Sequence, residues 1–98
     1  MSVIVNFGDR RTKDIFDGTD SKEARSVSKA LWSVAHRKLD MLNAAHDLLD
    51  LRVPPGNKLE KLRGDLAGFL SIRITDQFRV IFRFADGNAS DVRIADYH

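Results

Sequence analysis

The last third of the chain alternates apolar and polar residues, and this alternation limits the folds that the sequence can adopt. It runs through three stretches, which begin at Leu70, Phe78 and Asp91. Period-two alternation is the pattern of strands that bury one face. The turn-forming residues at 86–88, Asp-Gly-Asn, separate the last two stretches. The pattern therefore predicts an antiparallel sheet with one apolar face near the C-terminal end of the chain.

The loop between the first two strands decides which of their residues face each other. A two-residue loop would pair Ile74 with Arg79 and direct a charge into the core. A three-residue loop over 75–77 keeps the apolar residues on one face and places Arg73 opposite Arg79 on the other. Two facing arginines repel each other at a cost of roughly 0.2–1 kcal/mol. Either an anion lies between them, or both side chains point into water and are screened.

The same reasoning, applied to the second hairpin, places Arg83 opposite Asp91 and Arg79 opposite Ala95. Tyr97 then continues on the face of Arg79. We therefore expect one face of the sheet to display the two facing arginines and Tyr97 close together. The opposite, apolar face is expected to be covered by helices.

The N-terminal half predicts a strand and two helices. Residues 3–7 are β-branched and apolar for the most part, which favours a strand. A short helix is expected near 11–16, and a long helix with apolar residues at helical spacing over about 21–46. The sequence DSKE at 20–23 has the spacing of a capping box that begins the long helix. Two prolines and a glycine within 52–58 then predict a loop.

Composition excludes several classes of protein. With 98 residues, 43% of them hydrophobic, the chain suits a single domain over 1–98. It has no cysteine, which excludes disulfides, thiolate nucleophiles and cysteine zinc sites. It also lacks an apolar run long enough for a membrane span and a glycine-rich motif for a nucleotide. We therefore expect a cytosolic protein without a metal or another cofactor.

Positive charge is concentrated in the middle of the chain. The net charge of the whole chain is +2, but residues 52–83 carry seven basic and only three acidic side chains. Such a basic segment suggests an anionic partner. Lys58, Lys61 and Arg63 suit contacts with phosphates, and the alternative is a solvated loop.

The chain ends in a second group of candidate residues. His98 can transfer protons near neutral pH, and Tyr97 can stack on a base. The alternative is a frayed tail, which is common at chain ends. Because the strand pattern runs to Ala95, we expect the tail to begin on the sheet, near the arginine face.

Four short motifs after residue 50 are more specific than composition or periodicity. They are LRVPPGN at 51–57, LEKLRGD at 59–65, the pair SIRI and QFRV within 71–80, and DYH at 96–98. The sequence DMLNAA at 40–45 precedes them, at the end of the long helical pattern. Together they resemble the HigB-like branch of the RelE/ParE toxin superfamily, the killer proteins of bacterial toxin–antitoxin pairs, over essentially the whole chain.

The resemblance implies an α+β, RelE-like fold with an N-terminal strand and two helices packed on one face of a small, mainly antiparallel sheet. It implies an mRNA interferase that enters the ribosomal A site and cleaves the codon there, in the bacterial cytoplasm and away from any membrane. It also implies a cognate, HigA-like antitoxin with a helix-turn-helix domain, through which alone the toxin reaches operator DNA.

The resemblance also implies roles that suit metal-independent RNA cleavage by attack of the 2′-OH. Arg79 matches the catalytic arginine of the family, and Arg63 stands where relatives carry a lysine. Tyr97 and His98 match the terminal motif, with His98 as an acid or base, and Asp96 holds the tail or orients His98.

Position 60 also departs from the family. Some relatives carry a histidine where this chain has Glu60, so either Glu60 is the base or the acid–base work is distributed. Arg73 joins the catalytic set from the strand register rather than from the family. Arg52, Lys58 and Lys61 are expected to bind the substrate or ribosomal RNA.

Two other functions compete with the ribosome-dependent endonuclease. A ParE-like toxin of the same fold would poison DNA gyrase without cutting RNA, and fold does not decide between the two. Such a poison has no chemical need for the cations and the terminal Tyr97 and His98. A non-catalytic RNA-binding module would keep a salt-dependent affinity for phosphates but would show no cleavage.

Overall fold

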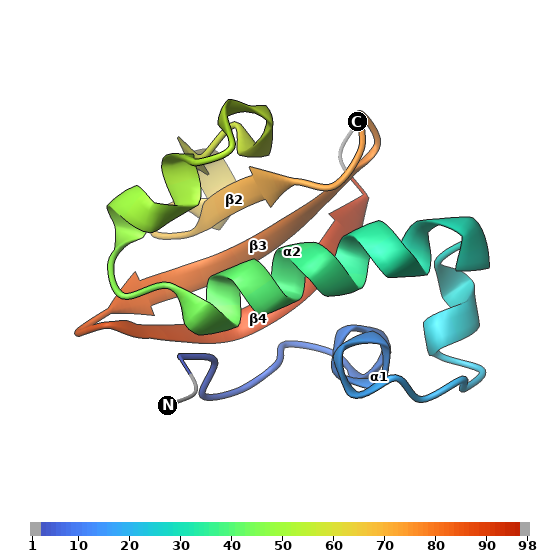
Figure 1. The fold of residues 1–98 in the computed structure, drawn as a ribbon. Coiled ribbons are helices and arrows are strands. Elements are labelled where there is room, and N and C mark those ends of the chain that lie inside the picture. The colour runs from blue at the N-terminus through green and yellow to red at the C-terminus, as the bar shows by residue number, and fades with distance from the viewer. Residues whose placement is uncertain (1–2, 97–98) are drawn as a thin grey trace.

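The computed structural model describes residues 3–96 and shows two layers, a sheet and the helices that cover one of its faces (Figure 1). The helices are α1 (Arg10–Asp17) and α2 (Trp32–Ala44). The strands are β1 (Glu60–Lys61), β2 (Leu70–Arg73), β3 (Phe78–Ala85) and β4 (Asn88–Asp96). Neighbours in the order β1-β2-β3-β4 are antiparallel. The predicted α+β class, with two helices on a mainly antiparallel sheet, is thereby confirmed.

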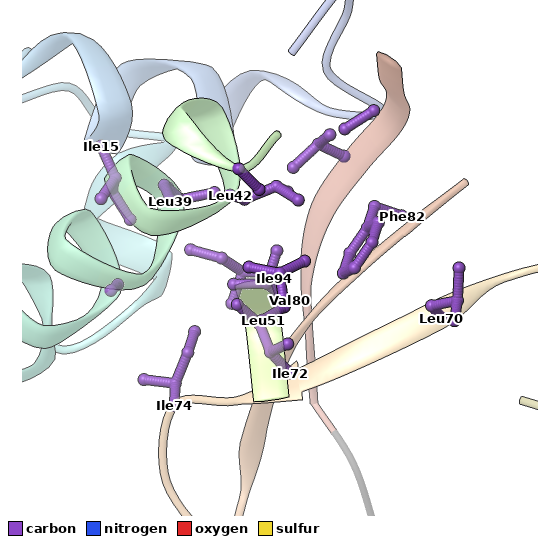
Figure 2. Close-up of a cluster of buried hydrophobic side chains, with 14 of the residues drawn as sticks. Ile15, Leu39, Leu42, Leu51, Leu70, Ile72, Ile74, Val80, Phe82 and Ile94 are labelled. Atoms are coloured by element: carbon purple, nitrogen blue, oxygen red, sulfur yellow. The ribbon is translucent and has the colours of Figure 1, made fainter. Parts of the chain in front are cut away.

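Helix α2 packs on the sheet because both surfaces are apolar where they meet. Leu39 and Leu42 of the helix share one buried cluster with Ile72, Val80 and Phe82 of the strands (Figure 2). Each such side chain stabilises the fold by about 1.5–3 kcal/mol when it is fully buried. This cluster determines which face of each strand points inward.

The second hairpin departs from the predicted register at one residue. Arg83 pairs with Ser90 and not with Asp91, so that pairing prediction is wrong. Asp91 has a φ of 51° and is the extra residue of a β-bulge. The bulge is favourable because it allows both Ala89 and Val92 to be buried. The side chains of Arg83 and Asp91 still meet, with 3.4 Å between Nε and Oδ2.

Residues 3–7 lie beside β4 but form no continuous strand. Two isolated parallel bridges, at Ile4 and Phe7, link them to β4. Between these bridges the side chain of Asn6, and not its backbone, accepts the N–H of Asp91. This side-chain bond interrupts the ladder, so the predicted N-terminal strand is reduced to the two bridges.

The short helix predicted near 11–16 is confirmed as α1, but the long helix predicted over 21–46 begins only at Trp32. Asp20 does not form the expected capping box. Its carboxylate pairs with Arg25 and Lys29, each at 2.8 Å, because these two cations compete with the backbone for its oxygens. The residues between form two short 3-10 helices, η1 (Ala24–Ser26) and η2 (Lys29–Leu31).

The segment between α2 and β2 starts on the α2 side of the sheet, where Leu51 joins the cluster of Leu39 and Val80, and ends on the other face. It contains three 3-10 helices, η3 (Leu48–Arg52), η4 (Pro55–Asn57) and η5 (Gly64–Leu66), so the predicted loop over 52–58 contains one helical turn. Farther along, Leu62 and Phe69 pack on Ile81, which alternates with the inward-facing Val80. The middle of the sheet is therefore buried on both sides.

Asn57 holds this segment against α2. Its side chain is fully buried, donates to the carbonyl oxygen of Leu51 at 3.1 Å and accepts a hydrogen bond from the ammonium group of Lys38. Lys38 is also buried, and burial lowers the pKa of its ammonium group. Asn57 thus anchors the chain directly before Lys58 and Glu60, which contribute to the site described below.

We expect Asn57→Ala to lower the free energy of unfolding by about 2–4 kcal/mol, because it leaves buried polar groups of Lys38 and Leu51 without partners. Urea unfolding, followed by circular dichroism, measures this loss. Asn88→Ala, at an exposed position, is the control and is expected to change stability by less than about 0.5 kcal/mol. Equal losses in the two variants would contradict the anchoring role.

Hydrogen bonds from Arg25 and Lys29 lower the pKa of Asp20 from 3.8 to about 2. Because the folded-state pKa is depressed, the stabilisation is present above pH 3.8 and is lost as the pH falls through about 2. An NMR titration of side-chain carboxyl carbons is expected to show a midpoint near 2, which moves toward 3.8 in an Arg25→Ala, Lys29→Ala double variant. A midpoint that stays in place in the variant would refute the two ion pairs.

Candidate active site

The register predicted for β2 and β3 is confirmed. Arg73 lies opposite Arg79, and Ile72 lies opposite Val80. Because Val80 belongs to the cluster under α2, Arg79 lies on the face that α2 does not cover. The two arginines are therefore neighbours on the face that the sequence assigned to them.

Arg79 is buried although it carries a charge, with only 7% of the residue exposed. Its Nη1 lies 2.9 Å from Oε1 of Glu60, and its Nη2 donates to the backbone carbonyl of Lys58. Lys58 has a φ of 45°, a left-handed conformation that is uncommon for a lysine. A buried guanidinium requires such partners, because an unpaired charge in the interior is costly.

The expectation that this face displays both arginines is wrong for Arg79. Leu62 and Phe69 cover Ile81 on this face, and the charges beside them are balanced by carboxylates of the chain itself. Glu60 pairs with Arg79, and Asp76 lies 2.5 Å from Nη2 of Arg73. Neither water nor an external anion is needed to separate the two arginines in this state.

The two ion pairs differ in their access to solvent. The side chain of Asp76 is 98% exposed and that of Glu60 is 51% exposed, whereas the side chain of Arg79 is only 8% exposed. The carboxylate of Glu60 therefore lies on the solvent side of Arg79. An anion that reaches Arg79 from solvent would exchange with this carboxylate.

Asp96 ends β4 and accepts a hydrogen bond from the side chain of Gln77, in the loop between β2 and β3. The residue before it, Ala95, lies opposite Arg79, as predicted. Tyr97 and His98 lie outside the described residues, and their position on the arginine face stays a prediction.

Within residues 3–96, the other predicted RNA-binding residues form no side-chain hydrogen bond or ion pair with this cluster. Arg52, Lys61 and Arg63 are exposed, and their side chains form no ion pair within residues 3–96. The structure thus brings together four of the predicted residues, namely Lys58, Glu60, Arg73 and Arg79. It leaves the remaining cations facing solvent.

Two buried polar residues near the site were missed by the sequence analysis. Ser71 of β2 lies opposite Glu60, is fully buried, and its hydroxyl has no hydrogen-bond partner within the described part of the chain. Lys38 stands three residues after Ala35 and four before Leu42, on the apolar side of the helical pattern. A charged residue on the apolar side of a helix is the sequence signal that could have identified Lys38 as a buried residue with a polar partner.

The charged groups of the site are cations and carboxylates, and in the described part of the chain they form no metal-binding cluster. Among residues 3–96, no three histidine, aspartate or glutamate side chains come close enough to hold a metal ion. No helix in the same range is long and apolar enough to cross a membrane. The chemistry that the described residues support is the binding and neutralisation of an anion beside a carboxylate.

Glu60→Ala is expected to lower the free energy of unfolding by about 1–3 kcal/mol, because it removes the carboxylate that balances buried Arg79. The expected loss is below that of a fully buried pair since Glu60 is half exposed. Thermal and urea unfolding measure it, with exposed Glu23→Ala as the control. An unchanged stability in Glu60→Ala would show that the ion pair is not formed in solution.

Comparisons with known proteins show the family of the chain. A family model described as the RelE-like toxin of the type II toxin–antitoxin system HigB matches residues 5–98. Toxin HigB-1 of Vibrio cholerae serotype O1 is 39% identical over 87 residues, which are 89% of this chain and 90% of that toxin. An uncharacterised protein of Haemophilus influenzae is 37% identical over 66 residues, 67% of this chain and 65% of that protein.

A solved structure shows the same fold. A chain of the YoeB–YefM complex from Staphylococcus aureus superposes with a TM-score of 0.57 over 97% of both chains, at 18% identity. At this identity the likeness concerns the fold alone. The family model and the identity to Toxin HigB-1 are more specific, since both span most of the sequence. The chain therefore belongs to the HigB family of RelE-like toxins of type II toxin–antitoxin systems.

Proposed function

We propose that this toxin is a ribosome-dependent mRNA endonuclease, which cleaves mRNA in the A site and so inhibits translation and growth. The observation that supports this most directly is the position of Arg79, paired with Glu60 and opposite Arg73 on one face of the sheet. Membership of the family supports it as well. A gyrase poison of the same fold has no chemical need for this grouping of charges.

The proposed reaction needs a base, an acid and a cation. The base takes the proton of the 2′-OH. The 2′-oxygen bonds to the phosphorus while the bond between the phosphorus and the 5′-oxygen breaks. The leaving 5′-oxygen takes up a proton from the acid. Negative charge grows on the phosphate in the transition state, so a fixed cation there accelerates the reaction. Arg79 is this cation, and Arg73 is its neighbour across the strands.

Glu60 is the proposed base. Its carboxylate lies on Arg79 in the structure, and the incoming phosphate takes its place there. The carboxylate, released on the solvent side, then accepts the proton of the 2′-OH. His98 is the acid for the 5′-oxygen, Tyr97 stacks on a base, and Asp96 orients the tail. Side chains supply every group in this mechanism, so it uses no metal or other cofactor.

The ribosome supplies positioning. Arg63 adds a further cation near the phosphate, while Arg52, Lys58 and Lys61 contact the phosphates of mRNA or ribosomal RNA without reading sequence. Holding the 2′-OH in line with the scissile bond contributes several kcal/mol, at most about 7–11 for a well-oriented reaction. This contribution explains how a few weakly acidic and basic side chains are enough to cleave mRNA on the ribosome.

The proposed partner that restrains the toxin is a cognate, HigA-like antitoxin with a helix-turn-helix domain. The description of the family as toxins of toxin–antitoxin systems supports a partner of this kind. The structurally similar chain is likewise named in a complex of YoeB with YefM. The toxin reaches operator DNA only through the antitoxin, in the bacterial cytoplasm.

Primer extension on a defined mRNA in a reconstituted translation system tests the proposal. Arg79→Gln is expected to reduce A-site cleavage by about 10²–10³-fold, the usual loss for one stabilising donor. Removal of Tyr97 and His98 is expected to reduce cleavage as well. Circular dichroism confirms that each variant is folded.

The controls separate the competing functions. Exposed Arg10→Gln changes the same charge outside the site and should cleave like the parent toxin. Growth arrest without any cut in the mRNA would favour the gyrase poison. Salt-dependent RNA binding without a cut and without growth arrest would favour the non-catalytic module.

The role of Glu60 has its own test. Glu60→Gln is expected to lower kcat by about 10²–10⁴-fold, because an amide does not accept the proton of the 2′-OH. Single-turnover cleavage on programmed ribosomes gives kcat and KM separately. A lower KM with an unchanged kcat would instead show that Glu60 only competes with the phosphate for Arg79.

A further inference from the structure

A second group of arginines lies on the same face of the sheet as Arg79, and no role has been assigned to it so far. The guanidinium carbon of Arg83 lies 4.3 Å from the ring centroid of Phe69, and that of Arg93 lies 5.2 Å from it. Both distances are in the range of a cation–π interaction. One aromatic ring therefore holds two guanidinium groups.

The loop before β2 is shaped for this stack. Gly68 has a φ of 93°, and a Cβ atom at Gly68 would lie 2.9 Å from Nη1 of Arg83. Any larger residue would both strain the backbone and displace the guanidinium. Phe69 itself is buried against Ile81, so the ring that the arginines share is held in place.

The positive charge of the group is only partly balanced. Arg83 contacts Asp91 with 3.4 Å between Nε and Oδ2, which is longer than a charge-assisted hydrogen bond. Within residues 3–96, Arg93 takes part in no ion pair. The side chain of Arg83 is 49% exposed, and Arg93 is half-buried. The ring of Phe69 thus orients two guanidinium groups that solvent can reach. The carboxylate of Asp91 balances only one of the two charges.

The position of the group relative to Arg79 indicates what it binds. Ile81 separates Arg79 from Arg83 along β3, and alternate residues of a strand share a face. Four residues of strand span about 13 Å. An extended RNA strand whose phosphate lies at Arg79 covers this distance in a few nucleotides.

We propose that Phe69, Arg83 and Arg93 form a second RNA-backbone site, which holds phosphates of the nucleic acid that flanks the cleaved nucleotide. Guanidinium groups fixed on a ring bind phosphate oxygens through paired N–H donors and lose little freedom on binding. The group touches no reacting atom, so it binds the ground state and the transition state equally. The inference rests on the proposed endonuclease function and adds a binding site to it.

The test compares an Arg83→Gln, Arg93→Gln double variant with an Arg10→Gln, Arg25→Gln double variant, which removes the same charge on and near α1. Binding to 70S ribosomes programmed with mRNA is measured at several salt concentrations, and single-turnover cleavage is measured beside it. The first variant is expected to bind at least tenfold more weakly, with a salt slope lower by about 1 for each lost contact. Its KM should rise while its kcat stays within about twofold of the parent value.

The outcomes distinguish this site from the proposed function. If the parent toxin binds ribosomes but never cuts mRNA, the endonuclease fails, and the binding data still decide the second site. If the parent cuts mRNA and both double variants bind and cut as it does, the second site is refuted alone. Unchanged ribosome binding with weaker antitoxin binding would also refute it, because the arginines would then serve an acidic protein partner.

Discussion

The packing of α2 on the apolar face of the sheet controls which face Arg73 and Arg79 occupy. Val80 and Ile72 are buried under the helix, and alternate side chains of a strand point to opposite faces. Arg79 and Arg73 must therefore lie on the far face. A shift of one residue in the pairing of β2 and β3 would bury charge under α2 and expose the core. The burial of the apolar side chains therefore stabilises the register that places the two arginines opposite each other.

The far face is a second packed layer, and this changes the character of the site. Leu62 and Phe69 cover Ile81, and the anchor of Asn57 on Lys38 holds the start of the covering segment against α2. Under this cover Arg79 cannot face water, and it is balanced by Glu60 and the carbonyl of Lys58. The proposed mechanism uses this arrangement, since the group that balances the buried cation is also the proposed base.

The arginines on this face differ in their exposure to solvent. Arg79 is buried and paired, whereas Arg83 and Arg93 lie on the ring of Phe69 and remain accessible. A buried, preorganised cation suits transition-state stabilisation, and accessible cations suit the binding of a flexible polyanion. The β-bulge at Asp91 contributes here, because it keeps Val92 inward and lets the side chain of Asp91 reach Arg83.

The sequence by itself determined three of the strands, their apolar face and the pairing of Arg73 with Arg79, because period-two alternation allows only one register of β2 and β3 that keeps charge out of the core. Its motifs also determined the family. Local patterns were misleading where side chains had competing partners, as with Asp20, which pairs with Arg25 and Lys29 instead of capping a helix. Only the tertiary structure decided that Arg79 is buried on Glu60 and that Arg83 and Arg93 share one ring. These contacts join residues from different elements across the far face, and no spacing within one element encodes them.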